Sequence, residues 1–284
     1  MLRFLRRFSS AILVLVVVGL GALLGSAHAR GPATFTAPYP ELRASTAPSV
    51  IARGEYLARG PGHCIECHGR PGETDPDGPL AGGRAIHLPV GTFYVPNLTP
   101  DRETGIGRRS DPELARVLRE GVRADGHAAL PFMSLNEASD DDIVALLSYL
   151  RAQPAVRNRV PSSEPNVLGE VVLAYVLEPA RSTRPAETHA PTDDIARGRY
   201  LVHVLSSCAS CHTRVDERTG ARIGEELAGG RITSFDGTRQ FETPSLRPDP
   251  RTGAVTGRSE DELVALFAAG DRRGDASPMP WRAL

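Results

Sequence analysis

The sequence contains no lysine, so all 33 basic side chains are arginines, and 34 acidic residues balance them. The resulting formal net charge of −1 excludes a chain made basic for nucleic-acid binding. No glycine-rich phosphate loop, serine nucleophile motif or acidic cation cluster is present, which leaves little support for a purely structural or binding module. The 284 residues are 40% hydrophobic, an ordinary globular composition with room for two modest domains.

Aromatic residues make up only 5% of the chain, and cysteine is scarcer still, with all four cysteines in one repeated pattern. The pattern is HCIECHG, with Cys64, Cys67 and His68, and SCASCHT, with Cys208, Cys211 and His212. On a helical turn, positions i, i+3 and i+4 share one face. Two thiols so placed can form thioether links to the vinyl groups of a haem, and the adjacent imidazole then reaches the iron. The pattern predicts two covalently bound haem c groups, and a large flat cofactor in each core agrees with the few aromatic residues.

Three other roles of a Cys-x-x-Cys pair fit this chain less well. A structural zinc site needs four converging ligands, whereas each motif offers at most three. A redox dithiol of the thioredoxin kind is expected in a βαβ context, of which the sequence shows no sign. Disulfides suit an exported protein, but such a short loop gains little closure entropy and would not require histidine at the next position twice.

Methionine is also scarce, and the two methionines after Met1 occupy matching places. Met133 lies in ALPFMSL and Met279 in ASPMPWRAL, each near a proline in a loop. Methionine usually fills gaps in a core, but matched positions in two copies favour axial ligation of each iron opposite the histidine. His127, six residues before Met133, is the alternative ligand and would make the first site bis-histidine.

The two motifs belong to an internal repeat. Residues 51–68 (IARGEYLARGPGHCIECH) align with residues 195–212 (IARGRYLVHVLSSCASCH) at a constant offset of 144, and LAGGR recurs further along. The sequence therefore predicts two copies of one domain, at residues 47–153 and 192–284. A proline-rich linker, residues 154–191, joins them. Its apolar segment, NVLGEVVLAYVL, is too short to span a membrane and is expected to form a helix docked between the copies.

The first 29 residues have the plan of a secretory signal peptide. Arginines near the start precede an uninterrupted apolar run of 14 residues, and Ala27-His28-Ala29 supplies small residues before the cut. A membrane anchor is the alternative, but the run is shorter than the roughly 20 residues that a spanning helix needs. We therefore expect export, removal of residues 1–29 and an extended mature N-terminus at residues 30–46.

Helix signals dominate the rest of the chain. SDPE at residues 110–113 and SEDE at residues 259–262 are capping boxes that open helices with apolar residues at intervals of three and four. Residues 139–151, SDDDIVALLSYLR, form another such helix, with acids at its start and arginine at its end. No alternating strand pattern is evident. The predicted fold is mainly α, with two tandem helical domains and long loops around haem.

On these residues the chain resembles dihaem and multihaem c-type cytochromes with tandem class I domains. The most specific parts are the two cysteine motifs and NLTPD-x-x-TGIG at residues 97–107, similar to the cytochrome subunits that serve periplasmic alcohol, aldehyde and gluconate dehydrogenases. The resemblance implies tandem cytochrome c-like domains with thioethers on all four cysteines. It also implies His68 and His212 as proximal ligands and Met133 and Met279 as distal ligands.

The resemblance further suggests supporting residues. Families of this fold often fix the proximal imidazole through a proline carbonyl about a dozen residues further along, which indicates Pro79, although the second copy has Glu226 there. Arg84 and Arg231, after paired glycines, are candidates for contacting haem propionates, and a solvated role is the alternative.

Two features depart from the dehydrogenase subunits, which typically have three haem motifs and a C-terminal membrane anchor. This sequence has two motifs, and only five residues follow Met279, so the second domain is expected to lack its last helix within these 284 residues. A fragment or an unusually exposed second haem would each explain that arrangement.

We therefore expect a periplasmic electron-transfer protein that passes electrons from a dehydrogenase to a terminal oxidase or another cytochrome. Filled axial positions would leave no open iron site for peroxide or oxygen. The alternative is a dihaem oxidoreductase of the cytochrome c peroxidase or thiosulfate dehydrogenase type, which needs an open or unusual axial position. Membrane association is expected only through an uncleaved leader or a membrane-bound partner.

Overall fold

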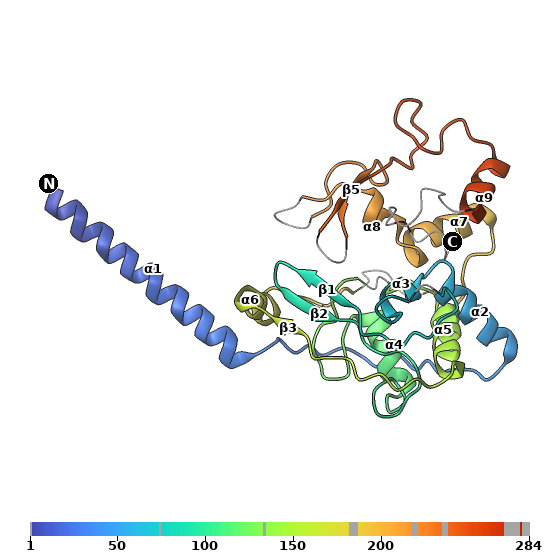
Figure 1. Cartoon of the computed structure of the whole chain (residues 1–284), viewed down its shortest axis with the longest axis horizontal. Coiled ribbons are helices and arrows are strands. Elements are labelled where there is room, and N and C mark those ends of the chain that lie inside the picture. The colour runs from blue at the N-terminus through green and yellow to red at the C-terminus, as the bar shows by residue number, and fades with distance from the viewer. Residues whose placement is uncertain are drawn as a thin grey trace.

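The structure is a computed structural model that describes residues 2–73, 75–132, 135–181, 187–216, 221–234, 238–269 and 279. Within these ranges the protein is mainly helical with a few short strands, which agrees with the predicted mainly α class. A long helix, α1 (Leu2–Arg30), projects away from a body that holds the other elements (Figure 1).

Helix caps define the first copy of the repeat. Its described elements are α2 (Pro48–Arg59), α3 (Cys64–His68), β1 (Ala85–Leu88), β2 (Gly91–Tyr94), α4 (Asp111–Glu120) and α5 (Asp140–Ala152). Ser110 and Glu113 exchange both hydrogen bonds of a capping box before α4, and the Ser139 hydroxyl accepts from the Asp142 N–H in α5. Because these caps satisfy otherwise free N–H groups, the two predicted helices form where expected and are confirmed.

The linker and the second copy follow. The linker holds β3 (Glu164–Pro165) and α6 (Val167–Tyr175), and the second copy holds α7 (Asp194–Tyr200), the π-helical turn η1 (Leu201–Leu205), α8 (Cys208–His212), β4 (Gly230–Thr233), β5 (Gln240–Thr243) and α9 (Glu260–Ala269). The third predicted helix, α9, is confirmed, since the Ser259 N–H donates to Glu262 and the Glu262 N–H donates to Ser259.

The structure also contains short strands, for which the sequence shows no alternating pattern. β1 and β2 form an antiparallel hairpin with Ala85 opposite Tyr94, and β3 pairs with the far side of β2. β4 and β5 form the matching hairpin of the second copy, with Gly230 opposite Thr243. Each strand has at most four residues, so alternation has too little length to show in the sequence.

The main core lies where α2 crosses α5. A Cβ atom on Gly54 would lie 1.8 Å from the carbonyl oxygen of Ala145, so only glycine permits this approach of the two helices. Leu57, Ile143 and Leu147 are fully buried around the crossing. The position of α5 over α2 closes the first copy.

The same core continues into the second copy. Leu205 is buried in the cluster, and Tyr200, Leu201 and Val204 pack against it. The wide turn of η1, closed by a 2.8 Å bond from the Ser206 N–H to the Leu201 carbonyl, lies in this contact. The two copies therefore share one hydrophobic interior.

The apolar helix of the linker is confirmed as α6, but its position differs from the expectation. It packs against α1 and β3 at one end of the body, not between the two copies (Figure 1). Small residues make this contact: a Cβ on Gly169 would lie 2.0 Å from the Val90 carbonyl oxygen, and Ala174 is buried. Composition predicted the helix but not the surface against which it packs.

α1 is longer than the apolar run alone suggested. Its segment Ser10–Arg30, 21 residues, is long and apolar enough to cross a membrane, judged by length and composition. A secretory signal sequence near an N-terminus has the same properties. The helix extends beyond the 14-residue apolar run at both ends, so its length fits a membrane anchor as well as a signal sequence.

Candidate functional site

Both Cys-x-x-Cys-His motifs form a single helical turn, α3 and α8, as predicted. The residue before each first cysteine has a left-handed backbone, with φ 36° at His63 and φ 48° at Ser207. Such a backbone is uncommon and strained outside glycine. Its presence at the same position of both copies shows that the two turns are built in the same way.

The four cysteines are free thiols, of which Cys211 is exposed and the others half-buried. Burial raises the pKa of each thiol, and raises that of Cys64 to about 12 with help from the neighbouring Cys67. A redox dithiol needs the opposite shift, because the thiolate is its reactive form. Within the described ranges, no three His, Cys, Asp or Glu side chains converge as a metal site, so the zinc interpretation gains no support.

His68 and His212 are each held by a proline carbonyl. Nδ1 of His68 lies 2.9 Å from the Pro96 oxygen, and Nδ1 of His212 lies 2.8 Å from the Pro244 oxygen. A carbonyl only accepts, so Nδ1 carries the proton and Nε2 keeps its lone pair. Burial lowers the pKa of His68 to about 4, against the opposing effect of the Pro96 carbonyl, so the ring is neutral. In both imidazoles Nε2 is therefore the nitrogen that could bind a metal.

The prediction of Pro79 as the acceptor is wrong. Pro96 and Pro244 follow their histidines by 28 and 32 residues, so residue counting along the chain misses them. The repeat contains the missed signal, since PNL at residues 96–98 aligns with PSL at residues 244–246. The second copy therefore follows the same plan as the first, despite Glu226.

A glycine brings each acceptor loop against its histidine. The N–H of Gly82 donates to the His68 carbonyl at 2.7 Å, and the N–H of Gly229 donates to the His212 carbonyl at 2.9 Å. Gly82 has φ +68°, and a Cβ there would lie 2.5 Å from the carbonyl carbon and oxygen of Pro96. Both the backbone conformation and the close approach require glycine.

Arg84 and Arg231 differ, although they occupy matching places. Nε of Arg84 is buried and has no hydrogen-bond partner among the residues that the structure describes. Arg231 pairs with Glu242 at 2.7 Å. A buried guanidinium nitrogen without a partner is unfavourable, and the charge of Arg84 reaches far enough to lower the pKa of Cys67 against the effect of burial. The first site therefore fits a group that brings both vinyl carbons and an anionic oxygen, as haem does.

The two predicted distal ligands stay predictions. Met133 lies outside the described residues, and Met279 is half-buried. The ring of His127, the alternative ligand, lies against the extended N-terminal segment, with Nδ1 3.1 Å from the Ala33 carbonyl oxygen. The backbone of His127 also pairs with Thr34.

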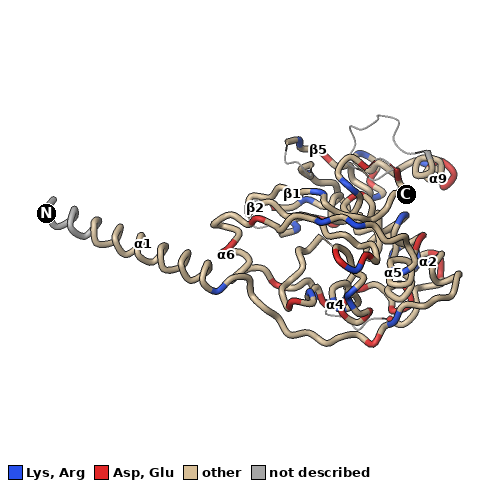
Figure 2. The backbone as a smooth tube through the Cα atoms, turned by 60° about the horizontal axis from the view of Figure 1, so that its bottom comes forward, with Lys and Arg blue, Asp and Glu red and all other residues tan. Residues whose placement is uncertain are grey.

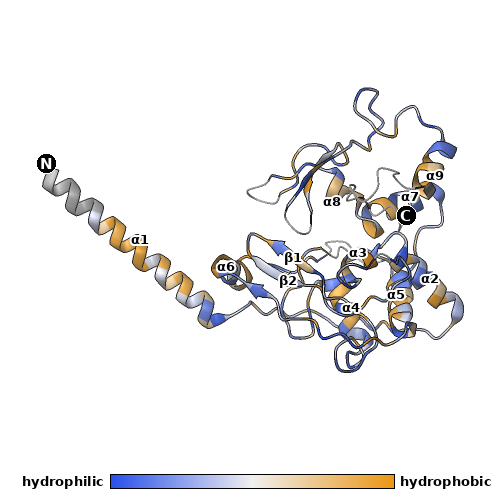
Figure 3. Ribbon diagram, in the orientation of Figure 1, coloured by the Kyte–Doolittle hydropathy of each residue, from blue (hydrophilic) through white to orange (hydrophobic). Residues whose placement is uncertain are grey.

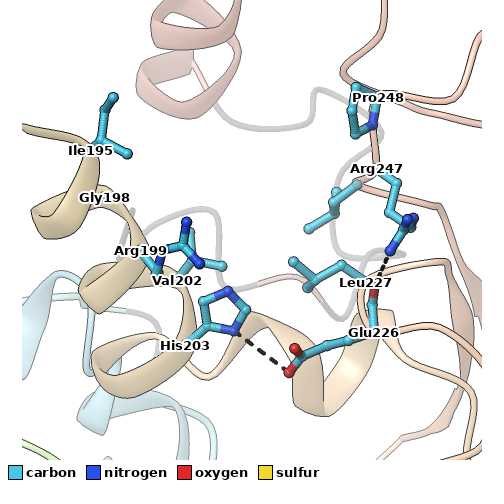
Figure 4. Close-up of a pocket in the computed structure, with 10 residues that line it drawn as sticks. Ile195, Gly198, Arg199, Val202, His203, Glu226, Leu227, Arg247 and Pro248 are labelled. Carbon is cyan, nitrogen blue, oxygen red and sulfur yellow. Dashed lines mark hydrogen bonds and ion pairs between the residues drawn. The ribbon is translucent and has the colours of Figure 1, made fainter.

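A cavity of about 570 Å³ flanks α7 in the second copy (Figure 4). Its apolar lining comes from Ile195, Gly198, Val202, Leu227 and Leu246. The matching surface of the first copy lies under α5. A Cβ on Gly198 meets no described atom within 4 Å, in contrast to Gly54. Among the described residues, the surface around Gly198 is therefore more open than the surface around Gly54.

Comparison with known proteins identifies the family, although no model of a protein family matches the chain. The chain is 34% identical over 238 residues to the gluconate 2-dehydrogenase cytochrome c subunit of Pantoea cypripedii, covering 78% of this chain and 51% of that protein. It is 30% identical over 283 residues to the fructose dehydrogenase cytochrome subunit of Gluconobacter japonicus, covering 95% and 53%. It is 30% identical over 223 residues to a diheme cytochrome c-type protein of Cereibacter sphaeroides, covering 72% and 71%. The chain belongs to the c-type cytochromes.

Membership of this family implies haem c as the cofactor of the cytochrome. Covalent attachment of haem c accounts for the two thiols and the imidazole on one helical turn, in α3 and in α8. It also accounts for the neutral ring of His68 with Nε2 free. The cytochrome spans about half the length of the first two relatives.

Proposed function

We propose that the cytochrome is an electron-transfer protein with two haem c domains, residues 47–153 and 192–284, joined by the linker at residues 154–191. In each domain the two cysteines of the motif form the thioethers, Cys64 and Cys67 in the first and Cys208 and Cys211 in the second. When bound, haem c supplies a one-electron couple. The chain supplies attachment, axial ligands and shielding from water.

The axial ligands proposed are histidine on one side and methionine on the other. His68 and His212 coordinate through Nε2, and their proline-bound Nδ1 atoms fix the ring orientation. Met133 and Met279 take the opposite positions. Two protein ligands per iron leave no open position for peroxide or oxygen, which favours electron transfer over catalysis.

We further propose that residues 1–29 direct export and that the cytochrome works in the periplasm. Two of the relatives are named as cytochrome subunits of gluconate and fructose dehydrogenases, which supports a dehydrogenase as the electron donor. The acceptor is then a terminal oxidase or another cytochrome.

The observation that supports this proposal most strongly is the pair of histidine–proline contacts, at 2.9 Å and 2.8 Å in the two copies. In both copies the histidine after the cysteine pair carries its proton on Nδ1 and donates it to a proline carbonyl. This shared arrangement supports two sites of the same kind.

Haem counting after periplasmic maturation tests the proposal. We expect the mass and the pyridine haemochrome spectrum to give two haem c groups per chain, and the double variants Cys64→Ala/Cys67→Ala and Cys208→Ala/Cys211→Ala each to lose attachment at one site only. A colourless chain, or one haem in the unsubstituted chain, would contradict the proposal. Rapid peroxide turnover by the unsubstituted cytochrome would identify a dihaem oxidoreductase instead.

The distal ligands are tested separately by near-infrared absorption. Met133→Ala and Met279→Ala are each expected to remove half of the methionine-to-iron charge-transfer band. His127→Ala is the matched control and should leave the band unchanged. Loss of haem spectrum features in His127→Ala with no effect of Met133→Ala would assign His127 as the ligand.

A further inference from the structure

α6 carries an unbroken apolar stripe on its outer face. The stripe consists of Val167, Leu168, Val171, Val172, Tyr175 and Val176, which recur at i, i+1, i+4, i+5, i+8 and i+9. This spacing places them on one side of a helix. Val176 is 64% exposed, Val167 60%, Leu168 56% and Tyr175 44%. Figure 3 shows α6 as one of the strongly hydrophobic segments at the surface of the body.

The stripe does not pack into the core, because α6 contacts the body through its opposite face. Gly169 approaches the Val90 carbonyl, where no side chain would fit, and Ala174 is buried. The one charged residue of the helix, Glu170, lies away from the stripe and contacts His28 at 3.2 Å. Small residues thus face inward and large apolar residues outward, the reverse of an ordinary surface helix. Contiguous exposed apolar surface marks an interaction site.

The chemistry beside the stripe identifies its partner as lipid. α6 packs on the end of α1: the hydroxyls of Ser26 and Tyr175 lie 2.8 Å apart, and the Arg30 guanidinium lies over the Tyr175 ring at 5.5 Å. Within the segment Ser10–Arg30 of α1, Arg30 at the base of the helix is the only arginine, and there is no Asp or Glu (Figure 2). This helix is long and apolar enough to cross a bilayer, and in that position its end lies at the membrane surface. Tyrosine and arginine side chains are typical of that level.

We propose that the α6 stripe binds the surface of a phospholipid bilayer. With nine residues, α6 is too short to span one, and an apolar face of this size inserts to about the boundary between headgroups and acyl chains. The stripe belongs to the part of the chain that remains if residues 1–29 are removed, whereas the assignment of lipid as its partner rests on the contact of α6 with α1. The proposal goes beyond electron transfer and does not depend on the number of haems.

The test compares two valines of nearly equal exposure. A nitroxide is attached to Val176→Cys, at the C-cap of α6, or, as the matched control, to Val264→Cys in α9, where Val264 is 61% exposed. The full chain is matured in the periplasm, so that its native cysteines are consumed by haem, and its N-terminus is read by mass. Each labelled protein is mixed with vesicles of phosphatidylcholine and phosphatidylglycerol.

At position 176 we expect vesicles to raise accessibility to oxygen and lower accessibility to a nickel chelate several-fold, with no change at position 264. Equal behaviour of both labels overturns the proposal. Spin–spin broadening at position 176 without vesicles also overturns it, because a second copy would then cover the stripe. Haem content and circular dichroism, measured on the same samples, separate this outcome from a failure of haem attachment or folding.

Discussion

The hydroxyl of Tyr200, in the second copy, donates a 2.8 Å hydrogen bond to the carboxylate of Asp142, in the first. It also accepts a 2.9 Å bond from the backbone N–H of Ser139. Burial is the main reason that the pKa of Tyr200 rises to about 12. One phenol thus joins the start of α5 to the end of α7.

Tyr200→Phe removes this join while it keeps the ring. We expect the free energy of unfolding to fall by about 1–3 kcal/mol, because the buried Ser139 N–H loses its acceptor. Asp142 keeps its bond to Arg53 at 3.0 Å, so the helix start remains paired. Chemical denaturation of the haem-loaded protein measures the change. Tyr56→Phe, at the matching place of the first copy, should change little, and an equal loss in both variants would contradict the role assigned to Tyr200.

Gly54 and Gly198 form a second matched pair. Gly54→Ala places a methyl group 1.8 Å from the Ala145 carbonyl oxygen, so we expect α2 and α5 to separate with a loss of about 3 kcal/mol or more. Gly198→Ala meets no described atom within 4 Å and should gain about 0.5–1 kcal/mol from helix propensity. Thermal unfolding of both variants checks the opposite signs.

Gly82→Ala tests the histidine–proline contact. Any alanine at positive φ loses about 1–2 kcal/mol, but at Gly82 its methyl group also pushes the Pro96 carbonyl away from His68. A weaker bond at Nδ1 makes the imidazole a poorer electron donor to iron, so we expect the reduction potential of the first site to rise. Redox titration measures the shift. Gly72→Ala is the control, because Gly72 also has a positive φ but a Cβ there meets no atom within 4 Å. A similar shift in potential in Gly72→Ala would show that the Pro96 contact is not the cause.

Arg84→Gln tests whether the Arg84 guanidinium, whose Nε is buried without a described partner, meets a haem propionate. Loss of a positive charge close to iron favours the ferric state, so we expect a lower reduction potential and weaker retention of native absorbance on heating. Arg231→Gln is the control, since Arg231 already pairs with Glu242. Equal potentials in Arg84→Gln and the unsubstituted protein would show that Arg84 does not contact the cofactor.

Local signals in the sequence were sufficient to predict α4, α5, α6 and α9. The capping boxes place α4 and α9 because their hydrogen bonds join residues three apart. The Pro96 contact was missed because it joins His68 to a residue 28 positions away, across a loop whose length no local rule fixes. The hairpins were missed because strands of four residues show no period. The place of α6 depended on which surface Gly169 could approach, and only tertiary structure shows that.

The cavity beside Gly198 has a consequence for the direction of electron flow. In the part of the chain that the structure describes, this cavity and the exposed Cys211 give water access to the second copy, whereas α5 covers the first. Water raises the local dielectric constant and so favours the extra charge of an oxidised centre. We therefore expect an electron shared by the two sites to reside on the first copy, and electrons that enter through the second to move inward, towards the α2–α5 core.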